Sequence, residues 1–136
     1  MGRARNTQNP GLLKDNDRLY RAKALRVAFR KLGHNLSLAD VLTMMENILC
    51  PYCRKAIDPL DYSIDHKTPK NRGGSNDLDN LHLVCIKCNR VKGDLEDSEF
   101  RELMKFLRNR PAIYNNLYVR LRMANMIYWR SRGRVK

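Results

Sequence analysis

Two pairs of cysteines restrict how the middle of this chain can fold. They are Cys50-x-x-Cys53 and Cys85-x-x-Cys88, and 31 residues separate them. Thiolate sulfurs bind zinc tetrahedrally, and each Cys-x-x-Cys turn offers two of them, so the two pairs together can form a closed structural site. The sequence shows no export signal, and disulfides are uncommon in the reducing compartment where such a chain is expected. The four cysteines therefore predict one structural Zn²⁺ per chain.

The segment between the pairs is longer than the roughly 15 to 20 residues of a usual zinc ribbon, so an additional unit must lie there. Turn residues are frequent in it. Apolar and polar residues alternate over 60–65, and Leu81, Leu83 and Cys85 alternate with His82 and Val84, patterns that are typical of short strands. Outside it, apolar residues recur at helical spacing over about 16–47 and 98–130. We expect an α+β fold with a motif core at 50–99 and a disordered basic tail at 1–14.

Capping and breaking residues divide each helical region into two helices. Gly33 predicts a stop, and Ser37 followed by Asp40 predicts the start of a second helix that ends near Asn47. In the second region Asp97 or Ser98 is the expected cap, and Pro111 predicts a break. Two helices should therefore precede the core and two should follow it.

The charge is concentrated at the two ends of the chain. The formal net charge is +13, of which residues 1–36 carry +7, residues 37–100 carry −3 and residues 101–136 carry +9. Basic arms predict contacts with a phosphate backbone, whereas carboxylates in the middle are suited to holding metal ions. The longest apolar runs are four residues, so we expect no membrane association and a cytoplasmic protein.

Four polar residues in and beside the zinc-binding segment point to chemistry. They are Asp65, His66, Asn80 and Asn89. Hydrolysis of a phosphodiester needs a base that deprotonates water and a divalent cation that neutralises charge, so one His and hard oxygen ligands are sufficient. Each of these residues alone would more often be ordinary, but their position around the cysteine pairs favours the functional interpretation.

The combination of motifs resembles the HNH endonucleases, which contain a ββα-metal motif. The resemblance rests on Cys50-Pro-Tyr-Cys53, Ile64-Asp65-His66 with Pro69, Gly73-Gly74, Asp79-Asn80-Leu81, and Cys85-Ile-Lys-Cys88-Asn89 with Lys92-Gly93. These motifs cover about a third of the chain and are specific in combination. The resemblance implies a treble-clef-like, zinc-stabilised ββα core inside a single nuclease domain at 15–136, and metal-dependent cleavage of DNA.

The resemblance also implies a role for each polar residue. His66 would be the general base, Asp65 a metal ligand, and Asn80 a residue that holds the base in position. Asn89 would be the second metal ligand, where many members of the family have His. Because an amide oxygen is harder than imidazole, the Asp65 and Asn89 pair should favour Mg²⁺ or Mn²⁺ as the catalytic ion.

Asp65 and His66 place a condition on the first strand. Neighbouring residues of a regular strand face opposite sides, so the two side chains could not both face one phosphate. We therefore expect the strand to end or bulge near Asp65.

The sequence offers several candidates for nucleic-acid contacts and two alternatives to the nuclease function. Cations near the site are candidates for phosphate contacts, namely Arg90, Lys92, Lys67, Lys70 and Arg72. One alternative is a noncatalytic zinc-finger protein that binds nucleic acid on the same scaffold. Another is an assembly factor that docks through its terminal helices onto a larger phage packaging or repair machine, a role that need not exclude nuclease activity. Within the HNH family, a compact basic protein of this kind looks most like the phage type. The oligomeric state and the preferred DNA structure are not determined by the sequence.

Overall fold

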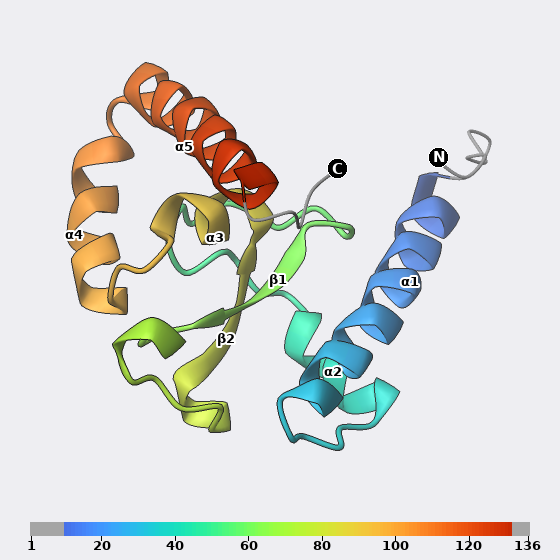
Figure 1. The fold of residues 1–136 in the computed structure, drawn as a ribbon. Coiled ribbons are helices and arrows are strands. Elements are labelled where there is room, and N and C mark those ends of the chain that lie inside the picture. The colour runs from blue at the N-terminus through green and yellow to red at the C-terminus, as the bar shows by residue number, and fades with distance from the viewer. Residues whose placement is uncertain (1–9, 132–136) are drawn as a thin grey trace.

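The computed structural model describes residues 10–131, in which a central hairpin lies between two groups of helices (Figure 1). The hairpin and the short helix after it form a ββα unit, with α1 and α2 on one side and α4 and α5 on the other. This confirms the α+β class, with two helices before the unit and two after it. The elements are α1 Pro10–Lys31, α2 Leu38–Met45, β1 Tyr62–His66, the 3₁₀ turns η1 Lys70–Arg72 and η2 Leu78–Asn80, β2 Leu81–Cys85, α3 Ile86–Lys92, α4 Asp97–Leu107 and α5 Pro111–Ser131.

The strand β1 pairs antiparallel with β2 and stays regular through its last residue. The register runs from Tyr62 opposite Cys85 to His66 opposite Leu81. Because β1 ends at His66, one residue after Asp65, the predicted end of the strand near Asp65 is confirmed, and no bulge is needed. Just after the end of β1, the N–H of Lys67 donates to the carbonyl of Asn80 at 2.8 Å.

The first helix begins earlier than expected. Pro10 is its first residue, a position that proline favours because its φ is already helical and its missing N–H is not needed there. The predicted disordered tail is therefore wrong for residues 10–14, and the rest of that prediction, residues 1–9, lies outside the described residues. The helix ends at Lys31, and Gly33 follows with a left-handed φ of +95°, as its predicted role as a stop requires.

The remaining helix ends follow local capping chemistry. Ser37 and Asp40 form the predicted capping box of α2, a device worth about 1 kcal/mol. The helix α4 is capped by Glu96, one residue before Asp97, the nearer of the two expected positions. Pro111 both separates α4 from α5 and begins α5, again as the first helical residue.

One apolar core joins the helices to the ββα unit. Tyr52, which lies between the first two cysteines, packs its ring edge-on against Phe100 of α4 with centroids 4.7 Å apart. The hydroxyl of Tyr62 donates to the carbonyl of Met45 at 2.9 Å, which ties α2 to β1. The most deeply buried side chains include Phe29, Val41, Met45, Tyr52, Val84, Phe100 and Met104. Among the described residues, no helix combines the length and hydrophobicity that a membrane span needs.

Candidate active site and metal centre

The four cysteines gather at one end of the hairpin. Their Sγ atoms all lie within 4.8 Å of one another, and those of Cys53 and Cys85 are 4.0 Å apart. All four thiols are free rather than joined in disulfides, and Cys50 and Cys88 are buried. Zn–S bonds of about 2.3 Å at tetrahedral angles would place neighbouring sulfurs about 3.8 Å apart. The sulfur spacing therefore suits a single zinc ion, and the predicted cysteine cluster is confirmed.

Hydrogen bonds of the local backbone fix the positions of these sulfurs. In the first pair, the N–H of Arg54 donates to the carbonyl of Cys50 at 2.9 Å, and Arg54 adopts a left-handed φ of +62°. In the second pair, Cys85 is the N-cap of α3, and its Sγ accepts a hydrogen bond from the N–H of Cys88 at 3.3 Å. The hydroxyl of Tyr114 in α5 lies 3.2 Å from the Sγ of Cys88. The C-terminal helix thus contributes a polar contact to the cluster.

The four cysteine thiols shift one another's pKa values. Hydrogen bonding from Cys53 lowers the pKa of Cys50, whereas hydrogen bonding to Cys50 raises the pKa of Cys85 and of Cys88. Hydrogen bonding to Cys50 acts to raise the pKa of Cys53, but hydrogen bonds from Cys85 and Cys88 lower it to about 6. The protons are therefore held on Cys85 and Cys88, and a bound dication would release them. A set of four sulfurs suits Zn²⁺ better than a hard cation such as Mg²⁺.

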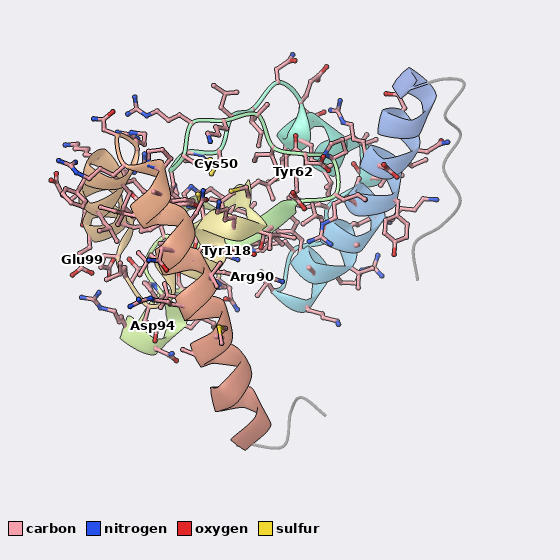
Figure 2. All side chains as sticks on the ribbon, turned by 90° about the horizontal axis from the view of Figure 1, so that it is seen from above. Cys50, Tyr62, Arg90, Asp94, Glu99 and Tyr118 are labelled. Atoms are coloured by element: carbon pink, nitrogen blue, oxygen red, sulfur yellow. The ribbon has the colours of Figure 1, made fainter. Side chains whose placement is uncertain are left out.

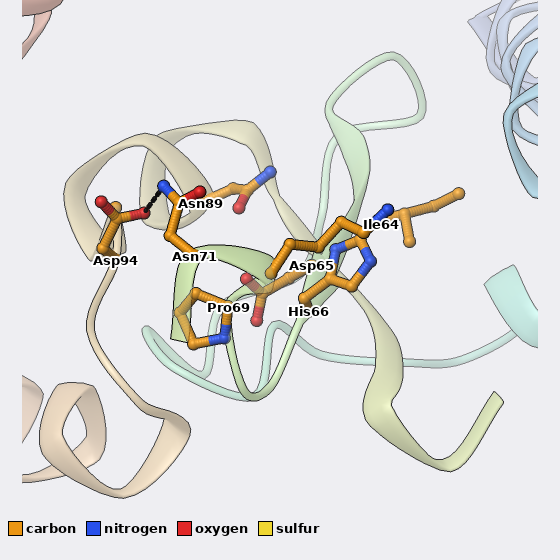
Figure 3. A pocket seen from close by; sticks show the side chains of 9 residues that line it. Ile64, Asp65, His66, Pro69, Asn71, Asn89 and Asp94 are labelled. Carbon is orange, nitrogen blue, oxygen red and sulfur yellow. Dashed lines mark hydrogen bonds between the residues drawn. The ribbon is translucent and has the colours of Figure 1, made fainter. Parts of the chain in front are cut away.

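A second site lies at the opposite end of the hairpin. It is an open cleft of about 290 Å³, shown in Figure 3. Three consecutive residues of β1 border it. The cleft is lined by Ile64, Asp65, His66, Pro69, Lys70, Asn71, Asn89, Gly93 and Asp94. Three predicted site residues, Asp65, His66 and Asn89, therefore share one cleft although the strand does not bulge.

The ring of His66 is held from one side. Its Nε2 lies 2.9 Å from the side-chain oxygen of Asn76, and the backbone carbonyl of His66 accepts a hydrogen bond from the Nζ of Lys92 at 2.8 Å. An amide oxygen only accepts, so Nε2 carries the hydrogen and Nδ1 has the lone pair when the ring is neutral. A proton-accepting nitrogen beside a polar cleft suits a general base.

The carboxylate of Asp65 is only 4 % exposed as a residue and is bonded by three side chains. Its Oδ2 accepts hydrogen bonds from Nε2 of His82 at 2.7 Å and from the hydroxyl of Tyr52 at 3.0 Å. Its Oδ1 lies 3.1 Å from the Nζ of Lys92. Burial and, after it, the charge of Asp65 raise the pKa of Tyr52, so this phenol stays a neutral donor. Because a carboxylate has about four lone-pair positions, Asp65 can still bind a cation.

The two asparagines of the predicted site occupy different places. Asn89 lines the cleft from α3, and its Nδ2–H donates to the Oγ of Ser63 at 2.7 Å, so the amide oxygen is the atom that could bind a cation. Asn80 lies outside the cleft lining. Its Oδ1 accepts from the N–H of Thr68 at 2.9 Å, and its Nδ2 donates to the carbonyl of Ser75 at 2.8 Å. Asn80 therefore ties together the loop that follows His66 and does not contact the His66 ring.

The prediction that Lys92 contacts phosphate is wrong. Lys92 is 1 % exposed, and its ammonium lies between the carboxylate of Asp65 and the backbone carbonyl of His66. A buried ammonium needs partners of this kind, because an unpaired charge is costly to remove from water. Lys92 therefore holds Asp65 and His66 in position from the interior of the protein.

The other four predicted cations lie nearer the surface. Arg90 is exposed on α3 and reaches the hydroxyl of Tyr118 on α5 at 3.4 Å, and Figure 2 shows the two side by side. Lys70 is exposed and lines the cleft. Arg72 is exposed and paired with Glu99, and hydrogen bonding to Glu99 raises the pKa of Arg72. Lys67 is half-buried.

Sequence reasoning missed the residues that hold the predicted ones. Tyr52, His82 and Asn76 contact Asp65 or His66 through side chains, yet none was selected from the sequence. Two signals were present. Tyr52 is a large polar aromatic between two zinc ligands, and Asn76 follows the Gly73-Gly74 turn that begins the return toward Asn80. The contact of His82 with Asp65 follows from the hairpin register, which places the two residues opposite each other.

Comparison with known proteins identifies the segment that contains both sites. Residues 50–95 match the family described as HNH endonuclease. The matched range includes the four cysteines and every residue that lines the cleft. The comparison with curated proteins gave no match.

Proposed function

We propose that the chain, of which residues 50–95 match the HNH endonuclease family, is a metal-dependent endonuclease that hydrolyses phosphodiester bonds of DNA. The observation that carries this proposal is that Asp65, His66 and Asn89 line one open cleft beside a closed cysteine cluster. A protein that only bound nucleic acid would need the cluster and the surface cations, but it would need no base beside two oxygen ligands.

Asp65 and Asn89 are the residues that would hold the catalytic ion. They offer one carboxylate and one amide oxygen, which is a hard donor set that leaves further positions for water and phosphate oxygens. This set fits Mg²⁺ or Mn²⁺, which when bound would neutralise charge on the phosphate and on the departing 3′-oxygen. His82, Tyr52 and Lys92 restrict rotation of Asp65, so its carboxylate is oriented before any ligand arrives.

His66 would take a proton from the attacking water. With Nε2–H donated to Asn76, the lone pair of Nδ1 is the acceptor for that proton. Attack opposite the 3′-oxygen would leave 5′-phosphate and 3′-hydroxyl ends. Asn80 contributes by closing the loop that carries the backbone away from His66, which makes it a positioning residue.

Surface cations around the cleft would bind the flanking phosphates. Lys70 lies on the cleft itself, whereas Lys67, Arg72 and Arg90 lie on neighbouring segments. Contacts of this kind are independent of DNA sequence and weaken steeply as salt is added. Together with the net charge of +13, they favour DNA as the partner of the cleft.

A plasmid-cleavage assay tests the proposed activity. Purified protein is incubated with supercoiled plasmid in Mg²⁺, in Mn²⁺ and in chelator, alongside a His66→Ala variant of matched zinc content. The wild type should cut in either metal and stop in chelator, and the variant should cut about 10² to 10⁴ times more slowly because it lacks the base. DNA binding without cleavage in both metals would contradict the proposal and favour the noncatalytic zinc-finger alternative.

A further inference from the structure

The support of the His66 ring comes from a residue four positions before Asn80. Nε2 of His66 lies 2.9 Å from Oδ1 of Asn76, whereas both polar atoms of the Asn80 side chain bond backbone atoms of Thr68 and Ser75. Rotation of an imidazole by half a turn about its Cβ–Cγ bond exchanges its two sides at little steric cost. The bond to Asn76 is what distinguishes the two orientations of this ring.

Asn76 is itself held by the N-terminal part of the chain. Its backbone carbonyl accepts a hydrogen bond from Nε2 of His34 at 2.5 Å, across 42 residues of sequence. His34 follows the end of α1, and its N–H donates to the carbonyl of Phe29 at 2.9 Å. Phe29 is fully buried in the core, so the position of His34 is set by the packing of α1.

The segment just before Asn76 is also restrained. A Cβ on Gly74 would lie 1.7 Å from the carbonyl oxygen of Thr68, so only glycine allows the loop to fold this closely. The carbonyl of Ser75 accepts a hydrogen bond from the Nδ2 of Asn80. Asn76 is thus fixed by its neighbours in the loop on one side and by His34 on the other.

We propose that Asn76 is the positioning residue that orients the His66 ring, and that His34 completes this support from outside the 50–95 segment. The proposal rests on the proposed function for the role of His66 in catalysis, but the orientation of the ring is measurable without cleavage. It implies that the 50–95 segment does not contain a complete active site, because the N-terminal helical region holds the residue that orients the base.

Substitutions at Asn76 separate orientation from folding. Asn76→Ala removes the acceptor, and kcat for cleavage of a DNA duplex should fall about 10- to 100-fold with little change in KM. Asn76→Asp keeps an acceptor oxygen at the same place and should retain most of the rate. Asn35→Ala removes an exposed asparagine next to His34 and serves as the matched control, with kcat and KM as in the wild type.

Substitutions at His34 test the link to α1. His34→Ala removes the donor to Asn76, whereas His34→Gln retains a side-chain N–H. The alanine variant should lower kcat by a smaller factor than Asn76→Ala, about 3- to 10-fold, because it loosens the loop without removing the acceptor. The glutamine variant should lie between the alanine variant and the wild type.

Ring-nitrogen NMR of the full, zinc-loaded chain supplies a readout that does not depend on activity. The chain has three histidines, so single variants assign each ring. In the neutral wild-type ring of His66, hydrogen should reside on Nε2, and Asn76→Ala should give a mixture of the Nε2–H and Nδ1–H forms. A wild-type ring with hydrogen on Nδ1, or an unchanged ring spectrum in Asn76→Ala, would overturn the proposal. A wild-type ring as expected in a protein that never cuts DNA would refute the proposed function and leave the positioning of His66 standing.

Discussion

The cysteine cluster and the cleft occupy opposite ends of the same short hairpin and differ in almost every physical respect. Cys85 lies opposite Tyr62 at one end of the ladder, and His66 lies opposite Leu81 at the other, four residue steps or about 13 Å along β1. The cluster offers four sulfurs, two of them in buried cysteines, within 4.8 Å of one another. The cleft is open and offers oxygen and nitrogen atoms.

This difference shows how one small scaffold can separate folding from chemistry. Four protein ligands satisfy zinc completely, so a metal in the cluster would have no open position for substrate. The cleft supplies two candidate oxygen ligands and leaves room for water and phosphate. We therefore expect the cluster to determine whether the chain folds and the cleft to determine whether DNA is cut.

The largest expected effect comes from the cluster. Cys50→Ser removes one of four zinc ligands, and zinc binding in sites of this type contributes about 10 kcal/mol or more to folding. The variant should contain far less than one zinc per chain and lose most of its helical circular dichroism. A folded, zinc-free Cys50→Ser protein would show that the core is stable without the metal and would remove the distinction between the two sites.

The next effect concerns two lysines near the cleft. Lys92→Met leaves the buried carboxylate of Asp65 without its ammonium partner, which typically costs about 3 to 5 kcal/mol. Urea unfolding of the zinc-loaded protein should show that loss. The control is Lys70→Met, because Lys70 is exposed on the rim and its removal should leave the unfolding midpoint unchanged. Equal stability of the two variants would mean that the ion pair between Lys92 and Asp65 does not support the fold.

A smaller effect tests the contact between the cluster and α5. Tyr114→Phe removes the hydroxyl that lies 3.2 Å from the Sγ of Cys88 and should cost about 1 kcal/mol, seen as a roughly fivefold gain in zinc loss to a competing chelator. Tyr118→Phe is the matched control on the same helix, since the Tyr118 hydroxyl accepts from Arg90 rather than from a cysteine. If both variants released zinc at the wild-type level, the hydroxyl of Tyr114 would have no role in holding the metal.

The smallest expected effect is on the affinity for DNA. Lys70→Gln should weaken binding of a DNA duplex a few-fold and reduce the slope of log affinity against log salt by about one, the value expected for one lost phosphate contact. Measurements in chelator keep the duplex intact. An unchanged slope would place DNA away from Lys70 and move the contact surface to the other exposed cations.

Local patterns in the sequence predicted a large part of the fold, and contacts between distant segments account for what was missed. The two strands, the caps at Ser37 and the helix break at Pro111 follow from residues within a few positions of each other, and the structure confirms them. The first strand also ends near Asp65 as expected, because its last residue is His66.

The candidate site, like the fold, has features that the sequence predicted and features that it did not. The Cys-x-x-Cys spacing of each pair by itself indicates a metal site, so the cluster was predictable from the sequence. The burial of Lys92 and the support of His66 by Asn76 and His34 depend on how α1 and α3 pack around the hairpin. Spacing along the chain contains no information on those distances, which is why an apparently exposed lysine proved to be buried.

Brief chelation, followed by three readings on one sample, tests the separation of the two sites most directly. Zinc content, helical circular dichroism and plasmid cleavage are measured before chelator, after it, and after Mg²⁺ or Mn²⁺ is restored. We predict that cleavage stops and then returns while zinc and helix content stay constant throughout, because the hard-oxygen site exchanges its ion and the cysteine site does not. Loss of zinc in step with loss of cleavage, or cleavage that continues in chelator, would contradict the account.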